Sequence, residues 1–294
     1  MKNLRSLLRV TFFPVMFIGF NGLSIWIANE ALGFGSTLLL MFIALITSFM
    51  VEIIIPYNAD WNESQGDTKR DIFHFFTNET MNYAGIFLLP FLSVFTLYPE
   101  VWPKEWPFLL QLIFAIVIFD LATTLFHYFS HKKPILWKFH AVHHAPARLY
   151  GLNGIMKHPL FQVMDSLVAV GPLLVIGIPQ EVAHCLVFAI FIQLLIQHSN
   201  ADMSTGPLRF LFATAELHRF HHLKGKAGDV NFALFLSVWD RILGTAYYED
   251  RVLTEGDLGI GSEPNYPKGY LQQLKKPFGK KITMDNEMGD LNAA

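Results

Sequence analysis

The chain has 294 residues, of which 52% are hydrophobic and 16% are charged, and its formal net charge is −2. This composition is too apolar for an ordinary soluble domain and predicts an integral membrane protein. The near-neutral charge offers no basic surface for nucleic acid, so no nucleic-acid partner is expected, and the single Cys185 excludes an intrachain disulfide.

The N-terminal stretch MKNLRSLLRVTFFPVMFIGF joins a basic start to an apolar run, as a signal peptide does. A second long apolar run follows almost at once, and no small-residue cleavage site is evident. We therefore expect the first stretch to be retained as a membrane span.

Six apolar stretches are long enough to cross a hydrocarbon core about 30 Å thick. They pair as three hairpins with short turns, at residues 10–28, 32–55, 82–98, 107–130, 159–178 and 181–200. If the chain starts in the cytoplasm, all but one of its 22 Lys and Arg residues lie on the inner side, and the exception is Lys104. We expect a multi-pass protein of the inner or plasma membrane.

Histidines recur with a spacing typical of metal ligands. HAVHH at residues 140–144 and HRFHH at 218–222 share the pattern HxxHH, and FHYFSH places His127 four residues before His131. Residues three and four apart share one face of a helix, so each motif offers several imidazoles toward one point. Random placement of 12 histidines rarely gives two HxxHH motifs.

The expected topology places ten histidines at the inner face of the membrane. His74, in an inner loop, and His184, in an outer turn, lie apart from this cluster and are expected to be structural. Eight clustered histidines together with His198 exceed the coordination sphere of one ion, which predicts a dinuclear site. Imidazole binds iron, copper and zinc alike, and HExxH is absent, so the residues alone leave the metal open.

The order HxxxH, HxxHH, the lone histidine of QHSN and HxxHH, followed by NFALFLSVWDRILGT, resembles the fatty acid hydroxylase and sterol desaturase superfamily of membrane di-iron oxygenases. The resemblance covers roughly residues 110–248, and PYNADWNESQGDTKRD upstream is similar to bacterial members. It implies an oxidoreductase that uses O2 and two iron ions, replaceable by zinc, to hydroxylate or desaturate a lipid C–H bond.

The resemblance also implies the metal ligands. Some members carry a second histidine shortly before the lone one, where this chain has Gln193 and Leu194, so we expect nine ligands. They are His127, His131, His140, His143, His144, His198, His218, His221 and His222. His158, in KHP, is either a tenth ligand or a residue that starts a helix beneath the site.

Two further polar residues are candidate catalytic groups. Asp120 is a carboxylate inside the apolar stretch 107–130, and such residues are functional candidates by default. It either orients an imidazole from another helix or bonds a neighbouring hydroxyl. Asn231 is the second candidate, because related proteins often carry an asparagine near the last motif. Asp165 and Asp229 are weaker candidates of the same type.

We therefore predict an all-α fold, a polytopic membrane bundle of about three helical hairpins whose cytoplasmic face carries a histidine-rich helical cap around a dinuclear metal site. The expected parts are an N-terminal membrane part at residues 1–100, a catalytic domain at 101–248 and a polar C-terminal tail at 249–294.

The substrate and partners are only partly constrained. Sterols, fatty acyl chains, ether lipids and carotenoids all remain possible substrates. No electron-carrier domain is recognisable, so a separate electron-donor protein is expected. Lys275, Lys276, Lys280 and Lys281 in the tail either meet that donor or anionic lipid, or are simply solvated. A membrane metal-binding or transport protein is the alternative of another class, although the histidines gather at one face instead of lining a path across the bilayer.

Overall fold

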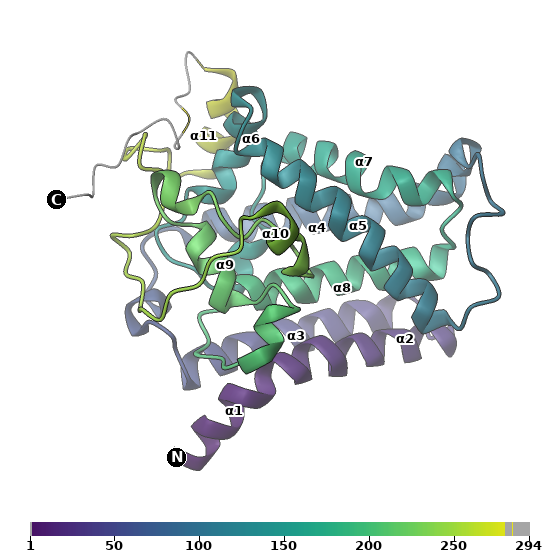
Figure 1. Ribbon diagram of the computed structural model, residues 1–294, viewed down its shortest axis with the longest axis horizontal. Helices are drawn as coiled ribbons and strands as arrows, with labels where there is room; N and C mark the ends of the chain where they lie inside the picture. The colour runs from purple at the N-terminus through teal and green to yellow at the C-terminus, as the bar shows by residue number, and fades with distance from the viewer. Residues whose placement is uncertain (1, 280–283, 285–294) are drawn as a thin grey trace.

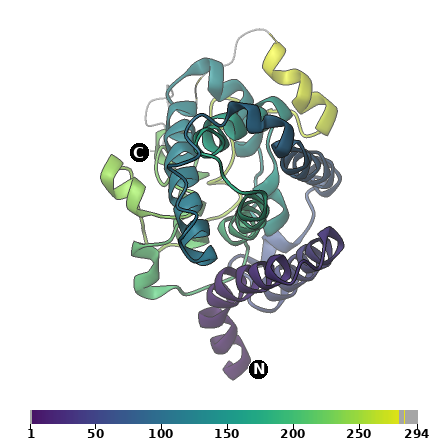
Figure 2. The same cartoon turned by 90° about the vertical axis from the view of Figure 1, so that its right-hand side faces the viewer.

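The computed structural model describes residues 2–279 and 284, and within them the protein is built from helices without a β-strand. Long helices lie side by side in a bundle, and the short helices α6, α9 and α11 gather at one end of it (Figure 1). Turned by 90°, the bundle is seen nearly along its helices (Figure 2). The predicted all-helical class is confirmed.

The N-terminal hairpin pairs a kinked helix with a straight one. The kinked helix comprises α1 (Lys2–Pro14), the π-helical turn η1 (Val15–Phe20) and α2 (Asn21–Asn29), and α3 (Phe34–Ile54) follows. Pro14 has no backbone N–H, so the regular hydrogen-bond ladder is interrupted where the π-helical turn begins. Gly33, with φ of 79°, forms the turn into α3.

Four helices among the described residues are long and apolar enough to cross a membrane: Lys2–Asn29, Phe34–Ile54, Phe108–Ser130 and Gln180–His198. Two predicted spans are not among them. Residues 82–98 are mostly the second half of α4 (Thr68–Leu92), whose first half buries polar groups, and η3 (Ser93–Phe95) ends the helical stretch. The stretch at 159–178 forms α7 (Pro159–Val175), an apolar helix of only 17 residues.

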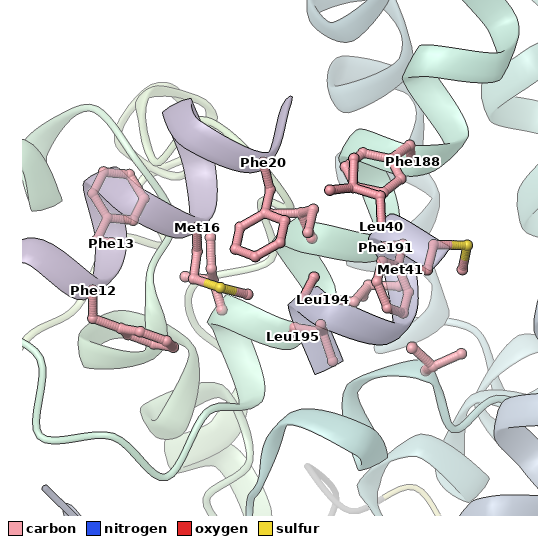
Figure 3. Packing of buried hydrophobic residues seen from close by; sticks show 14 of the residues in the cluster. Phe12, Phe13, Met16, Phe20, Leu40, Met41, Phe188, Phe191, Leu194 and Leu195 are labelled. Carbon is pink, nitrogen blue, oxygen red and sulfur yellow. The ribbon is translucent and has the colours of Figure 1, made fainter. Parts of the chain in front are cut away.

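Helix α8 (Gln180–His198) occupies the centre of the bundle. It packs against α2, α3, α4 and α5 (Phe108–Ser130), and most of its residues are buried. In the largest core cluster, Phe188, Phe191 and Leu194 of α8 lie near Leu40 and Met41 of α3 (Figure 3). Because α8 is fixed on several sides, its C-terminal end at His198 has a well-defined position.

Short helices and loops form a cap at the end of the bundle where α5 and α8 finish. The α-helices there are α6 (Pro134–His144), α9 (Ala215–His221), α10 (Val238–Leu243) and α11 (Tyr270–Lys275). The 3-10 helices are η2 (Ala59–Asn62), η4 (Gly151–Ile155), η5 (Gly206–Phe210), η6 (Gly225–Gly228) and η7 (Lys276–Phe278).

The described part of the expected polar tail packs on this cap. Leu253 and Leu258 are buried, and Gln273 of α11 lies within hydrogen-bond distance of His74 on α4. Lys276 forms an ion pair with Glu263. Lys280 and Lys281, also named as possible contacts of a partner, lie outside the described residues.

Candidate metal centre

The four elements that carry the expected ligands converge at the end of the bundle where α5 and α8 finish. His127 lies on the last turn of α5 and His131 caps that helix, while Pro134 starts α6 a few residues later and turns the chain back. The remaining ligands come from α6, the last residue of α8, and α9 with its C-cap. The structure brings all nine predicted histidines together.

The histidines form two groups, and within each group the candidate ligand atoms all lie within 4.8 Å of one another. The five-histidine group is His127, His131, His140, His144 and His221. The four-histidine group is His143, His198, His218 and His222. Two adjacent imidazole groups are the arrangement expected for a dinuclear site.

Each HxxHH motif contributes to both groups. His140 and His144, four residues apart on α6, enter the five-histidine group, whereas His143 between them enters the other. The second motif has the reverse assignment, with His221 alone in the five-histidine group. Residues i and i+4 lie almost above one another on a helix, whereas i+3 is offset to the other side, which explains the division.

The Nε2 atoms at the centre of each group face one another, and too few of them carry a proton for all to be hydrogen-bonded. The Nε2 atoms of His127 and His140 are 3.0 Å apart, and those of His140 and His144 are 3.1 Å apart. In the other group, the Nε2 of His218 lies 3.1 Å from that of His198 and 3.2 Å from that of His222. A neutral imidazole has one N–H, so bonds among these atoms leave lone pairs facing one another. A cation placed between them would satisfy those lone pairs.

One further buried nitrogen points to the same conclusion, because the Nε2 of His221 has no hydrogen-bond partner among the described residues. Burial lowers the pKa of His143 to about 3 and lowers the pKa of five further cap histidines well below the ordinary value. These five are His140, His144, His218, His221 and His222. Neutral imidazole is the form that binds metal, so the residues present fit two metal ions.

Acceptors behind the cluster fix five of the rings. His127 and His221 donate from Nδ1, each over 2.8 Å, to the carbonyls of Phe232 and Val230. His143 bonds the carbonyl of Met156, His198 bonds Oδ1 of Asn153, and His131 bonds Oδ1 of Asp229, at 3.0 to 3.1 Å. Such bonds leave Nε2 free for a metal and hold the ring orientation.

The structure corrects the expected contact of Asp120. Its two carboxylate oxygens accept from the backbone N–H groups of Leu234, Phe235 and Leu236, and from Nε1 of Trp239. Asp120 therefore bonds neither an imidazole nor a neighbouring hydroxyl in this structure. It instead anchors the segment that carries the carbonyl of Phe232.

Asn231 also binds backbone groups and not a histidine. Its Nδ2 donates to the carbonyls of Leu217 and Tyr247, and its Oδ1 accepts from the N–H of Tyr247. The residue has φ of 54°, a left-handed conformation that asparagine tolerates better than most residues. It thus shapes the same segment, between Val230 and Phe232.

The other histidines lie outside the two groups. His158 caps α7 by accepting from the N–H of Leu160, and its Nε2 bonds the carbonyl of Leu274, so both ring nitrogens are engaged. His74 lies against Gln273, and His184 bonds Thr37 near the opposite end of the bundle. These positions match a helix-start role for His158 and structural roles for the other two.

A small cavity of about 40 Å³ lies beside the cluster, between residues of α5, α7 and α8. Four of the histidines line it, together with Phe161, Phe232 and a polar cluster of Thr123, Lys157 and Asp165. Asp165, a weaker candidate, accepts from Thr123 at 2.6 Å and pairs with Lys157 at 2.7 Å. Sequence reasoning did not identify Lys157 or Asn153 as site residues, because neither belongs to a recognisable motif. Their contacts depend on how the segment between α6 and α7 folds.

A family model described as fatty acid hydroxylase matches residues 112–245. The ornithine lipid hydroxylase OlsE of Rhizobium tropici is 33% identical over 249 residues, which cover 81% of this chain and 74% of that protein. Alkylglycerol monooxygenases are also similar: that of Danio rerio is 31% identical over 154 residues, and that of Homo sapiens is 30% identical over 138 residues. These matches cover 52% and 47% of this chain but only 33% and 31% of the relatives. No solved structure gives a significant match.

Proposed function

The chain belongs to the fatty acid hydroxylase family, and from this premise we propose that it hydroxylates a C–H bond of a membrane lipid with O2 at two metal ions. The observation that carries the proposal is the pair of adjacent imidazole groups at the end of a bundle with four candidate membrane spans. The similarity to an ornithine lipid hydroxylase over most of both chains supports a polar lipid as the substrate.

We propose iron as the metal, with His127, His131, His140, His144 and His221 holding one ion and His143, His198, His218 and His222 holding the other. Two ferrous ions would supply the binding and reductive activation of O2. Imidazole discriminates weakly among divalent metals, so zinc is expected to replace iron during overexpression.

The proposed reaction balances with an external reductant. One atom of O2 enters the C–H bond to give an alcohol, and the other leaves as water with two protons and two electrons. We propose that the electrons come from a separate electron-donor protein that docks on the cap. The apolar residues Phe161, Leu194 and Phe232 line the cavity beside the histidines and would keep bulk water from the reacting carbon.

Asp120 and Asn231 are proposed to act as positioning residues, because each holds the backbone segment whose carbonyls fix two ligand imidazoles. The catalytic part of the chain is proposed to be residues 101–248, which include all nine candidate ligand histidines.

We propose that the cap faces the cytoplasm, because the segments on the side of the cap carry nearly all the Lys and Arg residues. A reporter at Ala294, a position outside the described residues, is expected to be cytoplasmic. A reporter near Glu181, in the turn before α8, is expected on the opposite side. Both reporters on one side would contradict this orientation.

The decisive experiment combines metal analysis with turnover. Purified protein from iron-replete cells is expected to hold about two metal ions and to consume O2 with a lipid extract, and ¹⁸O2 is expected to label the lipid product. His143→Ala and His221→Ala each remove one ligand from a different group and are expected to abolish turnover. His184→Ala is the matched control, since His184 lies near the other end of the bundle. One ion or none in folded protein, or turnover retained in both variants, would reject the proposal.

Lipid profiling of a deletion strain addresses the substrate directly. We expect a hydroxylated lipid to disappear and its unmodified form to accumulate. A transport role is not favoured, since the two groups lie together at one end of the bundle and do not follow it across.

A further inference from the structure

Helices α3 and α4 both pack against α8, and between them lies a groove of about 600 Å³. Aromatic and aliphatic side chains form nearly all of its wall, including Phe34 and Met41 of α3, Phe75 and Phe87 of α4, and Phe191 of α8. Met41 and Phe191 are neighbours in the core view (Figure 3). Several rim residues are exposed on the outside of the bundle, so the groove is accessible from the side.

The groove runs lengthwise along two helices, one of which is a candidate membrane span. It follows α3, a candidate membrane span, from Phe34 to Leu45, and α4 from Phe75 to Phe87. Twelve residues of helix extend about 18 Å. At its outer end Phe34 contacts Phe87, with ring centroids 5.3 Å apart.

One carboxylate interrupts this apolar wall. Glu79 is 7% exposed, its Oε1 accepts a bond of 3.2 Å from Asn82, and its Oε2 has no hydrogen-bond partner among the described residues. One turn further on the same face of α4, the hydroxyl of Tyr83 donates to the sulfur of Met41, a weak acceptor. A buried carboxylate oxygen without a donor is costly, so a ligand that supplies a donor would be stabilised here.

The carboxylate lies at the height of the boundary between cap and membrane helices. Asn78, next to Glu79 in sequence, donates to the carbonyls of Ile155 and Lys157, just before α7 begins at Pro159. The groove therefore has a polar group about one helical turn from its cap end, and an apolar length of about 12 Å that extends from Glu79 to Phe87.

The groove also lies close to the cavity beside the histidines. Phe191 lines the groove and Leu194 lines the cavity, and these residues are three apart on α8, less than one helical turn. Lys157 lines the cavity too, and its carbonyl bonds the residue next to Glu79.

We propose that this groove binds a membrane lipid, with the hydrocarbon chain along α3 and α4 and a hydroxyl or ammonium headgroup donating to Glu79. Resting on the proposed function, we further infer that the groove is where the substrate lipid first docks before its reacting carbon reaches the histidines. The substrate is then a lipid whose polar end carries a hydrogen-bond donor.

The binding test uses the full-length protein in detergent and does not depend on turnover. The probes are hexadecylglycerol, whose hydroxyls donate hydrogen bonds, and its di-O-methyl ether, which has no donor, with bound lipid measured by native mass spectrometry. We expect the wild type to bind hexadecylglycerol about tenfold more tightly than the ether, which is the effect of one hydrogen bond of about 1.4 kcal/mol.

Three variants locate the site. Glu79→Leu removes the acceptor with similar volume and is expected to abolish the preference between the two probes. Ala84→Trp fills the groove from α4 and is expected to abolish binding of both. Leu88→Trp, on the exposed face of α4 outside the groove lining, is the control and is expected to bind like the wild type. Equal affinity of the wild type for both probes, or normal binding by Ala84→Trp, would overturn the binding site.

Turnover separates the docking role from the proposed activity. With two metal ions retained in each variant, Ala84→Trp is expected to lower kcat/KM for the substrate lipid at least tenfold, and Glu79→Leu to raise KM about tenfold with kcat little changed. Unchanged kcat/KM in Ala84→Trp would overturn the docking role. If the wild type with two iron ions oxidises no lipid, the proposed function and the docking role fail, whereas the native mass spectrometry still decides whether the groove binds lipid.

Discussion

Replacing Asp120 by alanine tests whether a residue remote from the metals controls one of them. The side chain is fully buried and accepts four hydrogen bonds of 2.8 to 3.1 Å, three from the backbone of residues 234–236 and one from Trp239. The same segment supplies the carbonyl of Phe232 that fixes the ring of His127. Asp120→Ala therefore removes the anchor of a ligand support.

The cost follows from the donors left behind. An unpaired buried N–H group costs at least about 1 kcal/mol, so four of them cost about 4 kcal/mol. For a chain of this size, this loss corresponds to a fall in melting temperature of about 10 °C. Loosening a group that orients a metal-binding imidazole lowers metal affinity about 10- to 100-fold. The effect is expected at the five-histidine group, because Phe232 and Val230 support His127 and His221, which both belong to it.

The assay is thermal unfolding of the metal-loaded protein, with metal content measured before and after a mild chelator. We expect Asp120→Ala to unfold at lower temperature and to keep about one ion per chain where the wild type keeps about two. Asp202→Ala is the control, because Asp202 is an exposed partner of Arg9 and such pairs contribute little. An unchanged melting temperature together with two retained ions in Asp120→Ala would refute the reasoning.

Three further predictions concern the surroundings of the site. His198→Ala is expected to lose metal from the four-histidine group, whereas His158→Ala is expected to keep both ions and lose only stability. If elemental analysis finds equal metal loss in the two variants, His158 is a ligand. Gly154→Ala places a Cβ 2.4 Å from a backbone oxygen of α8, so we expect about 1 to 3 kcal/mol of destabilisation and weaker metal binding. Gly171→Ala, in the interior of α7 with open space around it, is the control and is expected to leave stability unchanged or to raise it by up to about 1 kcal/mol in the same unfolding assay. Burial lowers the pKa of His74 to about 4, below the value near 6.5 of an unfolded chain, so the unfolded state binds the proton first and stability falls as the pH drops from 6.5 to 4. His74→Gln is expected to reduce the slope of unfolding free energy against pH by up to about 1.4 kcal/mol per unit in that window, and an unchanged slope would contradict this.

The sequence predicted which histidines meet but not how they divide. Spacings of three and four residues place imidazoles on one helical face, and this local geometry needs no knowledge of the fold. The partners of Asp120 were not predictable, because they are backbone groups more than a hundred residues away whose position depends on the cap. The helix predicted to span the membrane at residues 82–98 begins earlier in the structure, at Thr68. The prediction missed this part because the first half of α4 is polar and its sequence is typical of a loop. In the structure Asp71 and Asn78 are buried there: Asp71 accepts from the hydroxyl of Tyr150, and Nδ2 of Asn78 donates to the carbonyl of Ile155.

The crossed contribution of the two HxxHH motifs would couple two bound metal ions. Because α6 and α9 each supply ligands to each group, a first ion at either group is expected to order both helices. The second ion is then expected to bind more tightly than the first, because the conformational entropy of these helices has already been lost. In the wild type, protein that holds one ion is therefore expected to be a minor species, whereas a variant that weakens one group alone, such as Asp120→Ala, still holds the ion of the other group.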